Sequence, residues 1–344
     1  MLRIGCIGVG HLGLEHIERL QNRVSGAEVV AVCARHQERA IMGADKAGVS
    51  HDKAYTDYRE MINDPEVDAV VITVPATAHK DAVLACLEAG KPCFVEKPLT
   101  DNAAESKEIV DAEIACGKRL VQVGFMKRYD NGVMQMKQMV DSGEFGSPLI
   151  CKYAQYANNI SKDYPYYGSD LQITDAATHE IDLFPWFVND EVVEVQALKT
   201  RSTRNAEGDL QDPMVCLLKT KTGILAIIEE YVNTKFLQFE YNSEIICEDG
   251  ILELPRHAFP KVKKDFRIIL PNTEDWTERY KELYENELQD WVTNVSRGTV
   301  SDYAASAWDG YIAAVIGDTL VESYKTGKEK KVPVDGTPDF YKKI

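Results

Sequence analysis

The sequence lacks several features that would point to particular classes of protein. Its eight cysteines form no CxxC pair, and it contains no HExxH, no GxSxG and no Cys/His cluster with metal-ligand spacing. Zinc-dependent chemistry and a disulfide scaffold are therefore not indicated, and we expect no metal. No apolar stretch approaches the ~18 residues that span a membrane. Basic residues are few: 39 Lys and Arg against 55 Asp and Glu give a net charge of -16, which disfavours nucleic acid as a partner.

What remains is the composition of an ordinary folded protein. The 344 residues are 44% hydrophobic and 27% charged, and at roughly 150 residues per domain they predict two domains. Cysteines inside apolar runs, such as Cys6 and Cys33, indicate reduced and buried thiols. His11 and Glu15 stand where a signal-peptide cleavage site would be expected, so we expect no secretory signal and a cytoplasmic location.

The first third of the chain alternates between short apolar runs and amphipathic segments. Strands are predicted at residues 2–8, 28–34, 69–74, 92–95 and 120–123, and helices at 12–23, 36–47, 56–62, 77–89 and 103–116. Strands that are apolar on both faces and alternate with helices are typical of a parallel, doubly wound sheet. We therefore predict an α/β Rossmann domain over residues 1–125.

The pattern changes after residue 125. A helix is predicted at 131–142, followed by strands at 149–157, 192–200, 214–219, 223–232, 236–248 and 250–254 and by long helices at 273–297 and 302–326. Successive strands without intervening helices indicate an antiparallel sheet. Residues 126–344 are therefore predicted to form an α+β domain; the alternative for its last helices is that they pack back on the first domain.

A glycine-rich loop, Gly8-Val9-Gly10-His11-Leu12-Gly13, follows the first predicted strand and opens the first predicted helix. In this context Gly8 makes the tight turn, Gly10 lets a pyrophosphate approach the backbone, and Gly13 lets the helix pack closely on the sheet. The N-terminus of the helix faces the phosphates. We therefore favour a dinucleotide-binding loop over a glycine-rich turn without a ligand.

The end of the second strand bears on the choice between NAD and NADP. In NAD-binding domains an acid at this point accepts hydrogen bonds from the adenosine ribose, but here the strand runs into Ala34 and Arg35. The Arg35 guanidinium could donate two hydrogen bonds to a 2′-phosphate, with His11 close by on the glycine loop. We predict NAD(P), with a preference for NADP. The alternative is that Arg35 is solvated or stacks on the adenine, which leaves NAD usable.

Two further segments carry groups suited to proton transfer. Glu96-Lys97-Pro98 closes the strand at 92–95, at the edge of a doubly wound sheet where ligands bind, so Lys97 would point into a crevice. Asp175 and His179 are four residues apart and share one face if they lie on a helix, with Asp182 a weaker candidate for the same face. The alternatives are an ordinary surface lysine and a histidine of the core.

Together these segments resemble the glucose-fructose oxidoreductase/inositol dehydrogenase (Gfo/Idh/MocA) family, and within it the myo-inositol 2-dehydrogenases. The resemblance covers nearly the whole chain and rests on the glycine loop, Glu96-Lys97-Pro98, residues 121–130 (VQVGFMKRYD), 178–182 (THEID) and 306–314 (SAWDGYIAA). It implies a nucleotide-binding Rossmann domain and a substrate-binding domain with a large open antiparallel sheet, which is often used in dimer and tetramer contacts.

The resemblance also implies an NAD(P)-dependent oxidoreductase that transfers a hydride between a ring hydroxyl carbon of inositol and the nicotinamide. Lys97 resembles the family's catalytic lysine, His179 its acid/base and Asp175 the accompanying carboxylate. The cofactor contacts that we expect are Gly8, Gly10, His11, Leu12, Gly13, Ala34, Arg35, Thr73, Val74, Pro75, His79, Glu96 and Lys97. The substrate contacts that we expect are Lys97, Lys127, Gln155, Asp175 and His179.

Two departures from the family pattern leave alternatives open. Ala34-Arg35 replaces the acid expected with NAD, and the stretch 151–170 has Gln155 and Ala157 where a histidine and an asparagine are expected to contact inositol. Because a site that hydrogen-bonds hydroxyl groups discriminates strongly, the substrate could be another cyclic polyol or a sugar, such as scyllo- or chiro-inositol or an aldose. A dinucleotide sensor without catalysis is the remaining alternative.

Overall fold

Apolar strands near the N-terminus form a seven-stranded sheet, sheet A. The computed structural model describes residues 1–158, 167–237, 239–254, 262–264, 267–269, 276–334 and 336–342. The strands of sheet A, in the order β15-β6-β5-β4-β1-β2-β3, are β1 (Leu2–Ile7), β2 (Ala27–Cys33), β3 (Ala54–Tyr55), β4 (Ala69–Ile72), β5 (Cys93–Glu96), β6 (Val121–Gly124) and β15 (Ala305–Ser306). Every pair is parallel except β15 with β6. The prediction of a parallel, doubly wound sheet is confirmed.

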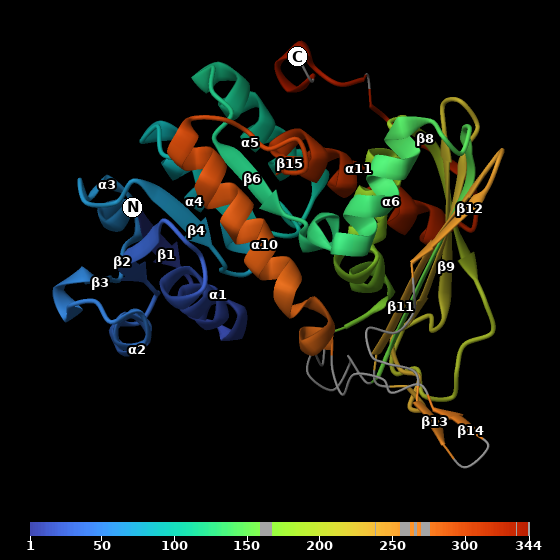
Figure 1. Cartoon of the computed structure of the whole chain (residues 1–344), viewed down its shortest axis with the longest axis horizontal. Helices are drawn as coiled ribbons and strands as arrows, with labels where there is room; N and C mark the ends of the chain where they lie inside the picture. The colour runs from blue at the N-terminus through green and yellow to red at the C-terminus, as the bar shows by residue number, and fades with distance from the viewer. Residues whose placement is uncertain are drawn as a thin grey trace. The chain divides into compact units, whose positions relative to one another are not determined.

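Helices connect these strands (Figure 1). They are α1 (His11–Asn22), α2 (Gln37–Ala47), α3 (Tyr58–Asn63), α4 (His79–Glu88) and α5 (Ala103–Cys116), with short turns η1 (His51–Lys53) and η2 (Ala76–Ala78); a further short turn, η5 (Asp339–Tyr341), lies near the C-terminus. β1 lies between β2 and β4, so the chain order reverses at this point of the sheet. In doubly wound sheets the carboxyl ends of the strands at such a reversal border the ligand site.

Two C-terminal segments pack with sheet A. The first unit of the structure comprises Met1–Met126, Leu283–Ala314 and Thr337–Ile344. α10 (Trp276–Arg297) contributes Leu288 and Trp291 to the core of this unit, where the Trp291 ring lies 5.9 Å from that of Phe94. These segments extend the first unit beyond residues 1–125, because the apolar side of α10 covers strands of sheet A.

The second unit comprises Lys127–Glu282 and Val315–Gly336 and contains sheet B. Its strands, in the order β12-β11-β7-β10-β9-β8-β16, are β7 (Pro148–Ala157), β8 (Val192–Lys199), β9 (Met214–Thr220), β10 (Leu225–Tyr231), β11 (Phe239–Cys247), β12 (Ile251–Leu254) and β16 (Lys330–Lys331). A separate hairpin joins β13 (Val262–Lys264) to β14 (Arg267–Ile269). The prediction of an antiparallel sheet is confirmed for the other pairs, and β7 and β10 form a parallel pair. The chain between β7 and β10 passes through helices and two other strands.

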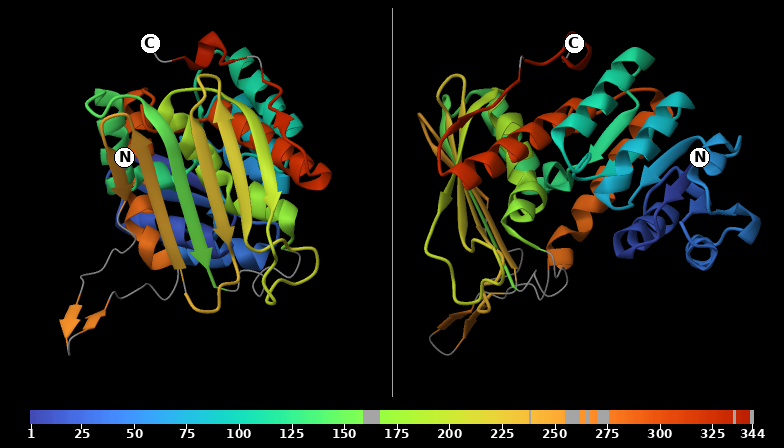
Figure 2. Two further views of the ribbon diagram at one scale, coloured as in Figure 1. Left: turned by 90° about the vertical axis from the view of Figure 1, so that its right-hand side faces the viewer. Right: turned by 180° about the vertical axis from the view of Figure 1, so that it is seen from behind.

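The helical segments of this unit lie before β7, between β7 and β8, and near the C-terminus. They are η3 (Met126–Tyr129), α6 (Asn131–Ser142), α8 (Ser169–Leu171), the π-helical turn η4 (Gln172–Ala176), α9 (Thr178–Val188) and the second half of α11 (Ala307–Thr326). α9 packs on β7, whereas no helix of the described residues covers the opposite face of sheet B (Figure 2, left). Along β11, residues therefore alternate between buried and half-buried.

The cysteines and the helices complete the description of the fold. All eight cysteines are free thiols and seven of them are buried, which confirms the prediction for those seven. No helix in the described ranges has the length and apolarity needed to cross a bilayer. Within the same ranges no group of three or more His, Cys, Asp or Glu side chains could hold a metal ion.

Candidate active site

The glycine loop connects β1 to α1. Gly8 has a φ of +106°, and a Cβ at this position would lie 2.7 Å from Thr73 Oγ1. A Cβ on Gly13 would lie 2.3 Å from the carbonyl oxygen of Gly8. At Gly10, by contrast, an added Cβ would meet no heavy atom of the described residues within 4 Å. The first and third glycines are therefore required by their surroundings, and the second leaves its backbone open to a ligand.

The start of α1 suits an anion. Gly10 is the N-cap, none of the described side chains caps it, and the first turn holds no acidic residue. Unsatisfied N–H groups and the aligned peptide dipoles give this end a partial positive charge. His11 is exposed and Leu12 is half-buried beside it. These donors fit the pyrophosphate of a dinucleotide.

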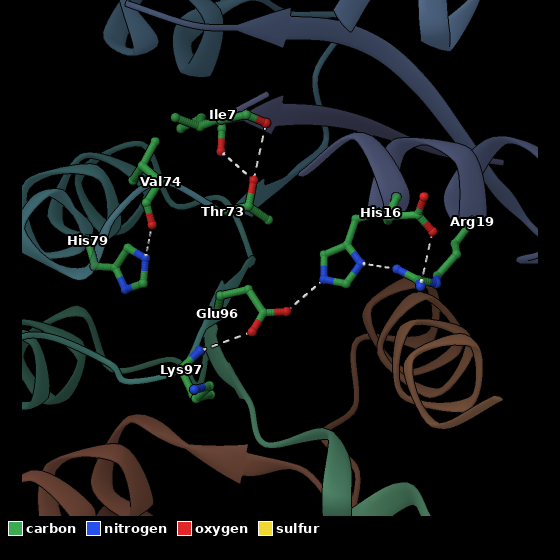
Figure 3. Close-up of polar contacts among 10 residues, drawn as sticks. Ile7, His16, Arg19, Thr73, Val74, His79, Glu96 and Lys97 are labelled. Atoms are coloured by element: carbon green, nitrogen blue, oxygen red, sulfur yellow. Dashed lines mark hydrogen bonds and ion pairs between the residues drawn. The ribbon is translucent and has the colours of Figure 1, made fainter. Parts of the chain in front are cut away.

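The residues after β4 hold the glycine loop from one side (Figure 3). The hydroxyl of Thr73 lies 3.2 Å from the carbonyl oxygen of Ile7 and 3.1 Å from that of Gly8, so its one hydrogen is shared between two acceptors. Val74 is half-buried and Pro75 is exposed. The loop after β4 is thus tied to the turn that begins the glycine loop.

His79 joins the loop after β4 to the loop after β5. Its Nε2 lies 2.7 Å from the carbonyl oxygen of Val74 and its Nδ1 lies 2.9 Å from that of Pro98. Burial lowers the pKa of His79, although both carbonyls oppose the shift. A neutral ring has a single N–H, so it donates to one of the two carbonyls at a time. Contact of His79 with the cofactor stays a prediction.

A chain of buried polar groups fixes Glu96 and the backbone of Lys97 (Figure 3). Arg19 Nη1 lies 3.1 Å from His16 Nδ1, and His16 Nε2 lies 2.7 Å from Glu96 Oε1. Since a guanidinium can only donate, Nδ1 of His16 accepts and Nε2–H donates to the carboxylate. The other oxygen of Glu96 accepts the backbone N–H of Lys97 at 3.2 Å. The Lys97 side chain is half-buried.

The sequence interpretation missed His16 and Arg19. Both lie on α1, with His16 three residues after Gly13 and Arg19 three residues after His16. This spacing places His16 and Arg19 on the same side of α1 as Gly13, which is in close contact with Gly8. That periodicity was the available signal, although it does not reveal a partner 80 residues away in the sequence.

The end of β2 carries no carboxylate. Ala34 is buried and Arg35 is exposed. Arg39, on the first turns of α2, donates from Nη2 to the carbonyl oxygen of Val9 in the glycine loop at 2.6 Å. Arg39 is therefore a second guanidinium at this corner of the sheet, and the sequence interpretation did not identify it.

Two buried ion pairs in the second unit connect η3 to α9. Lys127 Nζ donates to Glu180 Oε1 at 2.5 Å, and Arg128 pairs with Asp182 through Nε at 2.7 Å and Nη2 at 2.6 Å. The Asp182 carboxylate is thus bound to Arg128. The ammonium of Lys127 also donates to Gln155 Oε1 at 2.9 Å. The structure therefore brings together Lys127 and Gln155, two predicted substrate contacts.

Asp175 and His179 lie on one helical stretch that changes its winding. Asp175 is in the π-helical turn η4 and is half-buried, whereas His179 is in the first turn of α9 and is buried. The expectation of a regular α-helix through both residues is therefore wrong, because a π turn inserts a residue into the period. Ala157 ends β7, and residues 159–166 of the unusual stretch 151–170 lie outside the described residues.

Comparisons with known proteins decide the family. Residues 2–125 match the oxidoreductase family with an NAD-binding Rossmann fold (GFO/IDH/MocA), and residues 133–253 match the GFO/IDH/MocA C-terminal domain. The chain belongs to the GFO/IDH/MocA family. An inositol 2-dehydrogenase of Salmonella paratyphi B is 37% identical over 99% of both chains. An inositol 2-dehydrogenase/D-chiro-inositol 3-dehydrogenase of Shouchella clausii is also 37% identical, over 99% of this chain and 96% of its own.

A solved structure resembles this GFO/IDH/MocA member over its whole length. The myo-inositol dehydrogenase of Lactobacillus casei, solved in complex with NAD(H) and myo-inositol, has a TM-score of 0.92, 33% identity and coverage of 99% of this chain and 100% of its own. In our structure the glycine loop, Thr73, His79, Glu96 and Lys97 belong to the first unit, and Lys127, Gln155, Asp175 and His179 belong to the second.

Proposed function

We propose that this chain is an NAD(P)-dependent inositol dehydrogenase. It would move a hydride between a ring CH–OH carbon of the polyol and the nicotinamide. The observation that carries the proposal is the end-to-end similarity to inositol 2-dehydrogenases, at 37% identity over 99% of both chains. The glycine loop supports it, because the backbone at Gly10 is open and the start of α1 is uncapped by the described side chains.

The proposed roles follow from the chemistry of the side chains. The bound nicotinamide supplies the hydride acceptor. His179 takes the proton of the substrate hydroxyl as general base, while the ammonium of Lys97 donates a hydrogen bond to the same oxygen and stabilises its developing charge. Asp175 binds another hydroxyl and favours the imidazolium form of His179. Gln155 contributes a further polar contact, and Lys127 supports it by donating to its amide oxygen.

A substrate panel tests the proposal. Initial rates would be followed at 340 nm with myo-, scyllo- and chiro-inositol and with common aldoses, each with NAD and with NADP. We expect the highest kcat/KM with an inositol. A preference for an aldose would keep the chemistry but change the substrate. If no polyol or sugar reduces either cofactor, the dinucleotide sensor becomes the better account.

We also propose that the enzyme prefers NADP over NAD. The proposal is supported by Ala34 in place of an acid at the end of β2, by Arg35 directly after it, and by the guanidinium of Arg39, which donates to the carbonyl oxygen of Val9 in the glycine loop. Both groups suit a 2′-phosphate. The test compares kcat/KM for the two cofactors in the wild type and in Ala34→Asp, which should move the preference toward NAD. A strong NAD preference in the wild type would refute this part.

The assembly and the compartment are proposals of the same kind. The open face of sheet B carries apolar side chains from several strands: Ile150, Leu217 and Ile227 are half-buried, while Leu225 and Ile251 are exposed. We propose that this face makes the contacts of a homodimer or homotetramer. Light scattering coupled to gel filtration tests the oligomeric state, and a monomer would refute this proposal.

We also propose a cytoplasmic location, because eight free thiols favour the reducing environment of the cytoplasm.

A further inference from the structure

Three buried polar residues lie in a row across the middle of sheet B. Tyr241 on β11 is paired in register with Gln155 on β7, and Gln155 is paired in register with Glu230 on β10. All three are buried, and Glu230 is only 2% exposed. A carboxyl group in the centre of a sheet loses its hydration, so its protonation state and its partners need an explanation.

The contacts around this row fix the hydrogen-bonding role of each group. Lys127 is a pure donor and faces Gln155 Oε1 at 2.9 Å, so the amide nitrogen of Gln155 faces Glu230, where it donates to Oε2 at 3.2 Å. Lys127 donates a second bond to Glu180 Oε1 at 2.5 Å, and its ammonium lies 4.1 Å from the centroid of the Tyr241 ring. The three N–H groups of the Lys127 ammonium can therefore point to the Gln155 amide oxygen, the Glu180 carboxylate and the Tyr241 ring.

The charges of this cluster do not balance if both carboxyl groups are ionised. Glu180 forms the ion pair with Lys127, and no basic side chain of the described residues pairs with Glu230. Glu180 Oε2 and Glu230 Oε1 are both buried, and within the described part of the chain neither has a hydrogen-bond partner. The side chains of Glu180 and Glu230 are within hydrogen-bonding reach of each other, and their two acceptor oxygens are satisfied together when one proton lies between them.

The electrostatic surroundings place that proton on Glu230. Burial raises the pKa of Glu230 well above its ordinary value, and the carboxylate of Glu180 raises it further; the ammonium of Lys127 and the amide of Gln155 oppose the shift. On β9, burial and the charge of Glu230 both raise the pKa of the buried thiol of Cys216. Gln172, in the turn that also holds Asp175, donates to the backbone carbonyl of Glu230 at 3.3 Å.

We propose that Glu230 is a positioning residue for the dehydrogenase reaction: as a neutral acid it donates its O–H to Glu180 and accepts the amide of Gln155, and so holds Lys127, Gln155 and the first turn of α9 in one arrangement. This inference rests on the proposed function, in which Gln155 contacts the substrate and His179, the residue before Glu180, is the base. When Glu230 ionises, its carboxylate and that of Glu180 repel each other, and Lys127, Gln155 and the first turn of α9 are no longer held in this arrangement.

Glu230→Gln tests the place of the proton. The amide has the shape of the acid, is neutral at every pH, and can donate to Glu180 while it accepts from Gln155. In the wild type the native state holds one more proton than the unfolded state between the ordinary pKa of Glu near 4.3 and the raised pKa in the fold. The unfolding constant of the wild type relative to Glu230→Gln should therefore rise about tenfold per pH unit in this window.

Glu229→Gln is the matched control. Glu229 is the preceding residue on β10, is exposed on the opposite face and accepts a hydrogen bond from the hydroxyl of Tyr156. The substitution removes the same charge, and its unfolding constant should keep a fixed ratio to that of the wild type from pH 5 to 8. If the ratio for Glu230→Gln is also constant, or falls with pH, Glu230 is ionised in the fold and the proposal is wrong.

Steady-state kinetics test the positioning role. Above the pKa of Glu230, the KM of the wild type for its polyol should rise by about threefold to tenfold, the value of one neutral hydrogen bond, and the KM of Glu230→Gln should stay flat. Glu230→Leu should show the raised KM at every pH. Identical KM profiles in the wild type and Glu230→Gln would refute positioning. Absence of polyol turnover would refute the proposed function and positioning together, while the unfolding data would still locate the proton.

Discussion

Replacing Gly10 by alanine should weaken cofactor binding without destabilising the fold. Gly10 has an ordinary φ of -68°, and a Cβ there would meet no heavy atom of the described residues within 4 Å. A Gly→Ala change at a compatible backbone position alters the free energy of unfolding by about 1 kcal/mol or less. The added methyl group would nevertheless stand where a phosphate must approach the N–H groups at the start of α1.

The expected loss of affinity follows from those N–H groups. A hydrogen bond to a charged partner contributes about 1.5–3 kcal/mol, so the loss of one raises Kd roughly 10- to 150-fold. The assay is a fluorescence titration with NADH and NADPH for the wild type and Gly10→Ala, together with thermal unfolding of both proteins. Wild-type affinity in Gly10→Ala would refute the assignment of this loop to the pyrophosphate.

Two other glycines provide controls. A Cβ in Gly13→Ala would lie 2.3 Å from the Gly8 carbonyl oxygen and 2.6 Å from Thr73 Oγ1, so overpacking should cost about 1–3 kcal/mol of stability as well as binding. In Gly317→Ala, on α11, the Cβ would lie 3.5 Å from Thr174 Cγ2, an ordinary contact, and affinity should not change. A loss of stability in Gly10→Ala as large as in Gly13→Ala would contradict the open geometry.

Three further substitutions test other parts of the account. His179→Ala should retain cofactor binding and lose about 10² to 10⁴ in turnover at saturating cofactor; near-normal rates would remove His179 from the mechanism. Arg128→Ala should lower the free energy of unfolding in urea by about 3–5 kcal/mol because it removes the guanidinium from a buried ion pair with Asp182. Arg59→Ala, at an exposed pair with Glu88, should change the free energy of unfolding much less; equal losses would contradict the contrast. The hydroxyl of Tyr55 and the ammonium of Lys53 lower the pKa of Asp64 to about 2, so its carboxylate stabilises the fold above the ordinary pKa near 4 and this contribution disappears as the pH falls toward 2. The difference in free energy of unfolding between the wild type and Asp64→Asn should shrink over that range, and a constant difference would argue against the lowered pKa.

Local patterns in the sequence predicted most of the first unit. The five predicted strands and five predicted helices of the first 125 residues lie within about two residues of their predicted bounds, whereas the two-residue strands β3 and β15 were not predicted. Gly8 makes the predicted tight turn and Gly13 the predicted close packing, while the role of Gly10 stays a prediction. These features depend on short-range periodicity and on single positions where only glycine fits. The segments 283–314 and 337–344 were harder to assign, because an amphipathic helix does not reveal which sheet its apolar side will cover.

The polar partners in both units depend on contacts between distant residues. His16 and Glu96 are separated by 80 positions, Lys127 and Glu180 by 53, and Gln155 and Glu230 by 75. A single sequence contains no signal for such pairs. The π-helical turn at Gln172–Ala176 was missed for a different reason: hydrophobic periodicity over five residues cannot distinguish π from α winding.

The origin of the transferred hydride tests the central claim most directly. Myo-inositol carrying deuterium at C2 would be incubated with the enzyme and oxidised cofactor, and the reduced cofactor would be analysed by mass spectrometry and NMR. A ring-carbon dehydrogenase places the deuterium on C4 of the nicotinamide and shows a slower rate with the labelled substrate when hydride transfer limits turnover. Reduced cofactor without deuterium, or no reduction by any inositol, would contradict the account.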